Sequence, residues 1–367
     1  MRIGRNVIIL FVVFIEAVCA FASDFQQKDQ NQRTYLSDDF FIQTVKPKID
    51  VNPFSTPDSI EELVDCRAKI RSIMCLVEPA EEGQDSEMRL CQTGGENYAH
   101  FFETLFDFFP PVLRQMFCSL DKIFIEKKFI GTAYAGILKD PSGNVTGGVM
   151  GIRKSVLDEG LDLATWASWK EQLSYGGVTD SYTPLSHLPM IETSSEMTKV
   201  NDFLYFVVAH EFGHILDFTN EINKTKNCPD LLGEQVPPEC DMDENSWGGI
   251  GWATDRRPKT ENDFFNRSFL CFYWCNGNSI ASENVPRLYS DLFKTDFIST
   301  YATTQPWDDF ADSFAYFLMN KNLNTTYLIH TNQGTSYDIM AKLRSPVWNK
   351  KFQFLTHFFN RTDVIYP

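Results

Sequence analysis

One stretch of the sequence decides how the rest is interpreted, and it reads Asn201-Asp-Phe-Leu-Tyr-Phe-Val-Val-Ala-His210-Glu211-Phe-Gly-His214-Ile-Leu-Asp217-Phe. Its apolar residues predict a buried helix over 201–218. His210 and His214 are one turn apart, so both imidazoles leave the same face of that helix. Two imidazoles at this spacing fit two tetrahedral positions around one Zn²⁺. Glu211, the next residue round the helix, can reach a water on the metal as a general base.

A second segment offers candidates for the third protein ligand that zinc needs. It reads Tyr301-Ala-Thr-Thr-Gln-Pro306-Trp-Asp308-Asp309-Phe-Ala-Asp312-Ser-Phe. Pro306 fits the first position of a helix, and Asp308 and Asp312 then share one face. One carboxylate can bind zinc while the other accepts the free N–H of a zinc-bound histidine. Asp309 fits a solvated acid at the helix start.

The two segments together resemble the zinc peptidases related to the catalytic domain of anthrax lethal factor, within the broader gluzincin class. The resemblance rests on His-Glu-Phe-Gly-His-X-Leu-Asp and on the later tyrosine and paired acids. It implies an α+β, zincin-like metallopeptidase domain with a small mixed or antiparallel sheet and an active-site helix carrying HExxH. It implies Asp308 as the third zinc ligand, Asp312 and Asp217 as supporting acids, and Tyr301 as an oxyanion-stabilising residue.

The third-ligand position departs from the gluzincin pattern, because it holds Asp308 where that class has Glu. Aspartate is one methylene shorter, so its backbone must lie closer to the metal. Asp312 and Glu283 therefore remain alternative third ligands. The metzincin class is excluded, since its pattern requires Gly and His where this chain has Asp217 and Asn220.

Residues 1–22 predict a secretory signal peptide, because Arg2 and Arg5 precede a short apolar run and then small residues. The run is shorter than the roughly 20 apolar residues that span a bilayer. Of nine cysteines, Cys19 would leave with the signal. An even number in an exported chain predicts disulfides, with pairing inside each group as the simplest arrangement. The two groups are Cys66, Cys75, Cys91, Cys118 and Cys228, Cys240, Cys271, Cys275.

A zinc site built on Cys271 and Cys275 is the alternative to a disulfide, but no second close cysteine pair of the usual kind lies nearby. We therefore favour disulfide bonds for both groups. The predicted location of the mature protein is secreted, either extracellular or periplasmic.

The predicted organisation has four parts: the signal peptide at 1–22, a polar extended arm or pro-segment at 23–60, a helical, disulfide-bonded segment at 61–97, and the catalytic domain at 98–367. Apolar spacing predicts helices at 60–78, at 98–128 with a break at the two prolines 110 and 111, and at 285–296, 306–320 and 347–360. Strand-like runs at 129–138 and 148–157 flank a turn and predict a hairpin. We expect 148–157 to be the edge strand beside a bound peptide.

The composition limits the partners. The chain of 367 residues has 33 Lys and Arg against 49 Asp and Glu, a net charge of −16. This balance argues against a nucleic-acid partner, since phosphate binding needs clustered cations. We expect a monomeric, secreted zinc endopeptidase that acts on peptide or protein substrates, with no membrane span after signal cleavage. The alternatives are a catalytically inactive binding protein of the same fold and a zinc amidase acting on cell-wall peptide.

Overall fold

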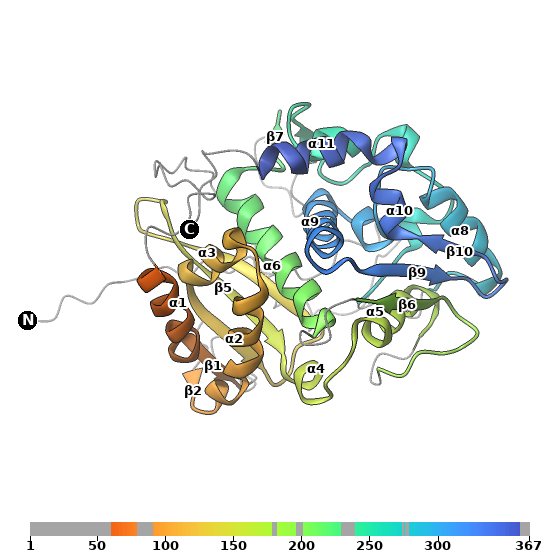
Figure 1. Cartoon of the computed structure of the whole chain (residues 1–367). Helices are drawn as coiled ribbons and strands as arrows, with labels where there is room; N and C mark the ends of the chain where they lie inside the picture. Colours follow the sequence, from red (N-terminus) through yellow and green to blue (C-terminus); the bar gives the residue numbers. More distant parts are fainter. Residues whose placement is uncertain are drawn as a thin grey trace, which may run out of the picture.

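The computed structural model describes residues 60–78, 91–177, 182–195, 201–228, 239–273, 275 and 279–359 (Figure 1). The predicted signal peptide, and the predicted arm apart from Ile60, lie outside the described residues. The described part is a mixed α+β structure. Within it, no helix combines the length and the apolar character that a membrane span requires.

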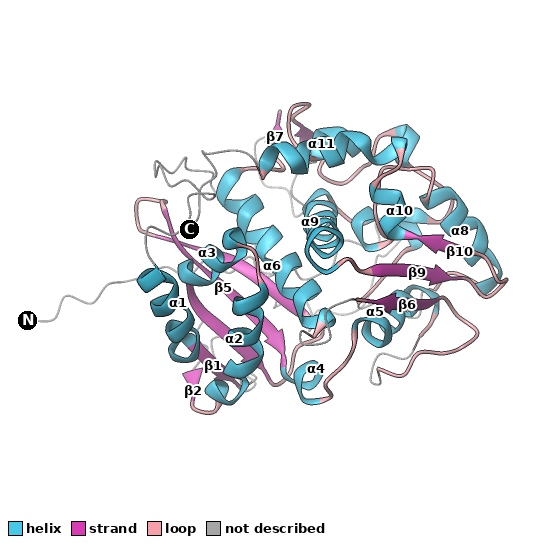
Figure 2. Ribbon diagram, in the orientation of Figure 1, coloured by secondary structure: helices cyan, strands magenta, loops and turns pink. Residues whose placement is uncertain are grey.

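A mixed sheet of five strands forms one layer of the molecule (Figure 2). Its strand order is β2-β1-β3-β5-β4. The three inner strands run parallel to one another, and the two edge strands β2 and β4 run antiparallel to their neighbours. The bounds are β1 Met74–Val77, β2 Cys91–Gln92, β3 Leu120–Glu126, β4 Ala133–Lys139 and β5 Val145–Arg153.

Two smaller antiparallel sheets and the helices complete the described structure. The small sheets have the order β10-β9-β6 and β7-β8. Their bounds are β6 Met190–Ser194, β9 Thr326–His330, β10 Ser336–Asp338, β7 Thr225–Lys226 and β8 Asp241–Met242. The helices are α1 Ile60–Ile73, α2 Ala99–Phe108, α3 Pro111–Ser119, α4 Lys154–Asp158, α5 Leu163–Gln172, α6 Asp202–Asn220, α7 Gly248–Gly251, α8 Val285–Leu292, α9 Pro306–Leu323, α10 Ile339–Leu343 and α11 Asn349–Phe358.

The predicted hairpin is confirmed, because β4 and β5 pair antiparallel around a turn in which Asp140 accepts hydrogen bonds from the N–H groups of Ser142 and Asn144. The predicted edge strand is wrong. The run 148–157 ends in α4, and its strand part belongs to β5, which lies between β3 and β4. The edge strand is β4, and it packs beside α6.

Two predicted helices are too long, and the excess forms the inner strands β1 and β3. The helix predicted over 60–78 ends at Ile73, and the one predicted over 98–128 ends at Ser119. Most of β3 is buried, as expected for a parallel strand covered on both faces. Such a strand has no polar alternation, so its apolar run cannot be told from a buried helix by periodicity. The sequence pattern does not reveal β3 as a strand, and because β3 pairs with β5, β5 is not at the edge of the sheet.

Helix α6 is the central helix of the fold and lies between the large sheet and α9 (Figure 1). Every residue from Phe203 to Asp217 is buried. The side chain of Asn201 caps its start by accepting a hydrogen bond from the Leu204 N–H at 2.9 Å. The helix ends at Asn220, and the next residue, Glu221, takes a left-handed conformation with φ 51°. A helix that is packed on all its faces has restricted motion, so its side chains are confined to particular rotamers.

Gly213 lets α6 and α9 approach each other closely. A Cβ atom added at Gly213 would lie 2.9 Å from the Cα atom of Ala311 on α9. Small residues at a helix crossing allow the two backbones to come together. The residues that flank Gly213 on α6 and Ala311 on α9 therefore face one another across a narrow gap.

The described cysteines form four disulfides, and each joins members of one predicted group. The bonds are Cys66–Cys118, Cys75–Cys91, Cys228–Cys240 and Cys271–Cys275. The pairing within groups is therefore confirmed. The alternative zinc site on Cys271 and Cys275 is wrong, because these two sulfur atoms bond to each other.

We predict that Gly213→Ala destabilises the fold by about 1–3 kcal/mol, the range for overpacking a closely packed contact. The added Cβ meets the backbone of Ala311, which can yield only if the two helices separate. Helix propensity alone predicts the opposite sign, a gain of about 1 kcal/mol for Ala over Gly. Chemical denaturation measures the difference. A variant as stable as the parent would show that the helices are not held at this separation.

Candidate metal centre

Helices α6 and α9 bring three potential ligand atoms to one point. Nε2 of His210 and Nε2 of His214 are 3.0 Å apart. Oδ1 of Asp308 is 3.4 Å from Nε2 of His214 and 4.0 Å from Nε2 of His210. Ligand nitrogens at the usual zinc distance lie about 3.3 Å apart in a tetrahedral site. Two imidazoles and one carboxylate at these separations therefore fit a zinc ion with a fourth position open.

Asp308 is oriented by two neighbours from the turn before it. Its Oδ2 accepts hydrogen bonds from Oγ1 of Thr304 at 3.0 Å and from Nε2 of Gln305 at 2.6 Å. This leaves Oδ1 directed at the imidazoles. Burial raises the pKa of Asp308, but its contacts with His214 and His210 outweigh burial and bring the pKa below its ordinary value. The carboxyl group is thus held in its ionised form.

Asp312 lies behind His210 rather than within the ligand cluster. Its Oδ1 is 2.8 Å from Nδ1 of His210, the ring nitrogen that points away from the cluster. The pair is at hydrogen-bonding distance, although neither atom has an aligned hydrogen-bond partner. Its Oδ2 accepts from Oγ of Ser299. Glu283, the other alternative ligand, is exposed on the 3₁₀ turn Ser282–Asn284 and lies outside the cluster.

Glu211 is buried in the same cleft and is 5% exposed. Among the described residues its Oε2 atom has no hydrogen-bond partner. Burial raises the pKa of Glu211, and the positive charges of His210, His214 and Lys170 oppose that shift. A buried carboxyl group beside a potential metal centre, with one oxygen unengaged, is suited to accept a proton from a water molecule.

Tyr301 lines the cleft from a 3₁₀ turn, Tyr301–Thr303, that precedes α9. Its ring centroid is 5.8 Å from that of His210. Glu171 on α5 holds the turn in place, because its two oxygens accept from Oγ1 of Thr300 at 2.7 Å each. The hydroxyl of Tyr289 on α8 donates to the same carboxylate. The position of Tyr301 therefore depends on α5 and α8.

Asp217 joins α6 to α9 instead of contacting the cluster directly. It accepts hydrogen bonds from the backbone N–H of Asn223 at 2.7 Å and from its side-chain amide at 2.6 Å. The same amide donates to the carbonyl of Pro306 at 3.0 Å, at the start of α9. Burial raises the pKa of Asp217 to about 7, although the Asn223 bonds and the charge of His214 favour the ionised form.

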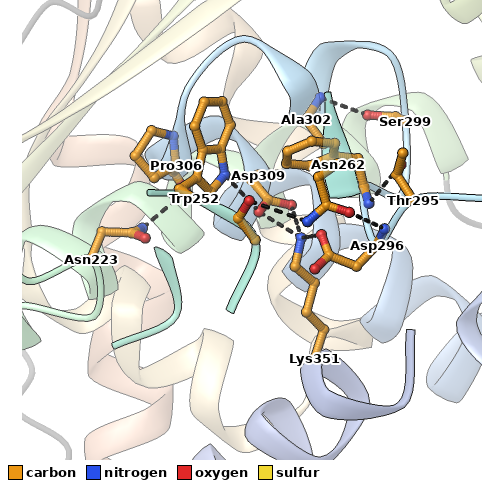
Figure 3. A network of polar contacts seen from close by, with 12 residues as sticks. Asn223, Trp252, Asn262, Thr295, Asp296, Ser299, Ala302, Pro306, Asp309 and Lys351 are labelled. Carbon is orange, nitrogen blue, oxygen red and sulfur yellow. Dashed lines mark hydrogen bonds and ion pairs between the residues drawn. The ribbon is translucent and has the colours of Figure 1, made fainter. Parts of the chain in front are cut away.

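The prediction that Asp309 is a solvated acid is wrong. Asp309 is fully buried and contacts Nζ of Lys351 from α11 at 2.6 Å (Figure 3). Trp252 donates its ring N–H to the same carboxylate at 3.1 Å. Asp296 also pairs with Lys351, at 2.9 Å. These partners are distant in sequence, so a pattern of acids at a helix start gives no sign of them.

The cleft around the candidate centre has walls that the motifs do not include. They come from the start of the edge strand β4, from α5 and from the segment near Tyr273. Among these additional lining residues, Lys170 on α5 has the charged side chain. The additional lining residues are Thr132, Ala133, Tyr134, Ala135, Trp166, Lys170, Phe206, Val207 and Tyr273. Phe206 and Val207 lie on α6 within one turn of His210. The others reach the cleft through tertiary packing, so no short motif marks them.

We predict that Lys351→Met destabilises the protein by about 3–5 kcal/mol, the range for breaking a buried ion pair. The substitution removes the cation that contacts both buried carboxylates, Asp296 and Asp309. As a control, Lys294→Met removes an exposed lysine whose surface pair with Asp291 contributes about 0–1 kcal/mol. Equal losses of unfolding free energy in the two variants would contradict the buried network.

Comparison with known proteins adds one finding. A model of the family described as "Putative zinc-binding metallo-peptidase" matches residues 285–363, less than a quarter of the chain. No curated protein and no solved structure matches the chain. The matched region contains Tyr301, Asp308 and Asp312 but begins well after the two histidines on α6. It therefore supports a zinc-binding metallopeptidase independently of the histidine motif.

Proposed function

We propose that the protein is a secreted zinc endopeptidase with a zincin-like catalytic domain. The observation that carries the proposal is the convergence of His210, His214 and Asp308 from two helices nearly a hundred residues apart in sequence. The family match over α8 to α11 and the lethal factor resemblance of the two motifs support the same activity. The activity class thus rests on separate segments that the fold brings together.

The residues suited to hold zinc are His210, His214 and Asp308, with Asp312 fixing the tautomer of His210 from its other ring nitrogen. When bound, Zn²⁺ supplies Lewis acidity, which makes a water acidic near neutral pH and polarises a carbonyl oxygen. The donor set of two nitrogens and one carboxylate oxygen is typical of catalytic zinc sites, which keep a fourth position for water.

Two side chains of the cleft have roles in the proposed chemistry. Glu211 accepts a proton from the attacking water and delivers it to the leaving amine. Tyr301 directs its hydroxyl at the oxygen on which negative charge develops. Both residues lie in the cleft within reach of the imidazoles, and both are largely buried, so their interactions act in a medium of low polarity.

The substrate we propose is a peptide or protein segment that extends along β4. This strand has an unpaired edge in the described structure, and its first three residues line the cleft. An extended peptide can add to such an edge through main-chain hydrogen bonds. A substrate bound there lies directly over the candidate centre. We propose that the enzyme is a monomer.

Secretion is the remaining part of the proposal. Residues 1–22 have the features of a signal peptide, and the four disulfides suit an oxidising compartment. The mature chain would then act outside the cell or in a periplasm.

We predict that Glu211→Gln keeps zinc and lowers peptide turnover by about 10²–10⁴-fold, the contribution of a positioned general base. Glutamine preserves the size of the side chain but cannot take the proton. Mass spectrometry of a diverse peptide mixture reads the cuts, and elemental analysis reads the zinc. The exposed Glu159→Gln serves as the matched control.

Turnover equal to the parent in Glu211→Gln would contradict the base assignment. A parent protein that binds zinc and cuts no peptide would favour the inactive binding protein. Cuts confined to cell-wall peptides would favour the amidase.

We predict that Asp308→Ala lowers zinc occupancy far more than Asp312→Asn, because Asp308 supplies a ligand atom and Asp312 only orients His210. Elemental analysis after dialysis against a weak chelator measures the occupancy. The exposed Asp121→Ala is the control, since Asp309 belongs to the buried network and would report on stability. A larger loss in Asp312→Asn would make Asp312 the third ligand.

A further inference from the structure

Lys170 places a positive charge inside the candidate cleft. It lies on the last turns of α5 and lines the cleft together with Glu211 and Tyr301. Its Nζ atom is 3.3 Å from the ring centroid of Tyr301. The rings of Trp166 and Phe272 lie 5.3 Å and 5.9 Å from the same atom. Three aromatic faces therefore surround this ammonium group.

The charge of Lys170 has no anionic partner in direct contact. Among the described residues, none forms an ion pair or a hydrogen bond with its Nζ. The neighbouring Glu171 is engaged by Thr300 and Tyr289. Lys170 is also the one cationic side chain, apart from the histidines, among the described residues that line the cleft.

Placing the Lys170 ammonium group there costs free energy unless a ligand with a complementary charge binds to it. A half-buried ammonium group loses part of its hydration, and aromatic faces replace only some of that interaction. Most lysines in the described part of the chain avoid this by lying at the surface or beside a carboxylate. Glu211 and Glu171 lie close enough to Lys170 for its charge to oppose the rise that burial causes in their pKa values, but neither forms an ion pair with it. A cation with no directly bound anion, in a cleft that receives a substrate, is suited to bind an anion that the substrate brings.

The position of Lys170 relative to β4 defines where that anion must be. Trp166, one turn earlier on α5, donates its ring N–H to Oγ1 of Thr132 at 3.0 Å. Thr132 directly precedes β4, so this bond sets α5 against the beginning of the edge strand. A peptide extended along β4 therefore presents one side chain or its end to Lys170, close to the scissile bond.

We infer that Lys170 selects substrates that carry a carboxylate near the scissile bond, an inference that rests on the proposed peptidase function. The carboxylate can come from an Asp or Glu side chain or from the free C-terminus of the peptide. Both sources offer the same charge-assisted hydrogen bonds to the ammonium group. Lys170 is thus a specificity residue that contacts the substrate, separate from Glu211.

Paired peptides test the inference. Each cleaved sequence is made with Glu or Gln at the position facing the cleft, and with a free or an amidated C-terminus. We expect the parent to favour the carboxylate form by about tenfold to a hundredfold in kcat/KM. Lys170→Met should abolish that preference, so that the variant cleaves the carboxylate and neutral forms with equal kcat/KM. Lys170→Arg should keep the preference, and Lys170→Glu should reverse it, so that the neutral form is cleaved faster than the carboxylate form.

Lys321→Met is the matched control, because Lys321 also lies over two aromatic rings, those of Phe317 and Phe359, but outside the cleft. It should leave the preference unchanged. A second readout needs no turnover: when Lys170→Met is added to Glu211→Gln, binding of the carboxylate peptides should weaken about tenfold to a hundredfold relative to binding of the neutral peptides. The peptide pair whose preference is lost in Lys170→Met, either Glu against Gln or free against amidated C-terminus, identifies the source of the carboxylate.

Two results would overturn the inference. One is a parent that cleaves and binds neutral and acidic peptides equally well. The other is a Lys170→Met variant that loses turnover of all peptides to the same extent, which would make Lys170 a residue acting on Glu211 or Tyr301. If no peptide is cleaved but binding still depends on the carboxylate and on Lys170, the proposed function fails while the binding site stands.

Discussion

The close contact between Gly213 and Ala311 is the constraint on which the candidate centre depends. Zinc ligands on separate helices can meet only if the helices approach closely, because an aspartate side chain is short. A Cβ atom at position 213 would lie 2.9 Å from the backbone of α9, so glycine is what permits this separation. His210 and His214 flank the contact on α6, and Asp308 and Asp312 flank it on α9. Geometry at the centre is therefore set by backbone packing.

Several polar contacts then hold α9 in the orientation that the crossing allows. Asp217 and Asn223 connect the end of α6 to the carbonyl of Pro306. On the far side of the same helical turn, Asp309 pairs with the buried Lys351 (Figure 3). Burying these charges away from water is tolerable only because each has partners. The consequence is a first turn of α9 held from two sides, which keeps Asp308 directed at the imidazoles.

Prediction from sequence succeeded where the signal is local. The spacing of His210 and His214 and the pairing of Asp308 with Asp312 follow from one helical period, and structure places all four in contact across α6 and α9. The hairpin at β4 and β5 and the grouping of cysteines were also predictable. The edge strand was not, because β3 has an unbroken apolar run that resembles a buried helix. Which strand of the hairpin lies at the edge of the sheet depends on β3, because β3 pairs with β5.

The amino-acid sequence alone therefore specifies the residue types of the candidate centre, their spacing along two helices and the disulfide groups, since each depends on neighbours within a few turns or on composition. The tertiary structure determines how the remaining side chains are oriented and which of them are buried. It directs Asp308 to the imidazoles and Asp312 to the far side of His210. It buries Asp309, places β4 at the edge of the large sheet and brings Lys170 over Tyr301. These outcomes arise from contacts between segments that are distant in sequence. A local sequence pattern cannot predict them, because their free energies depend on residues outside it.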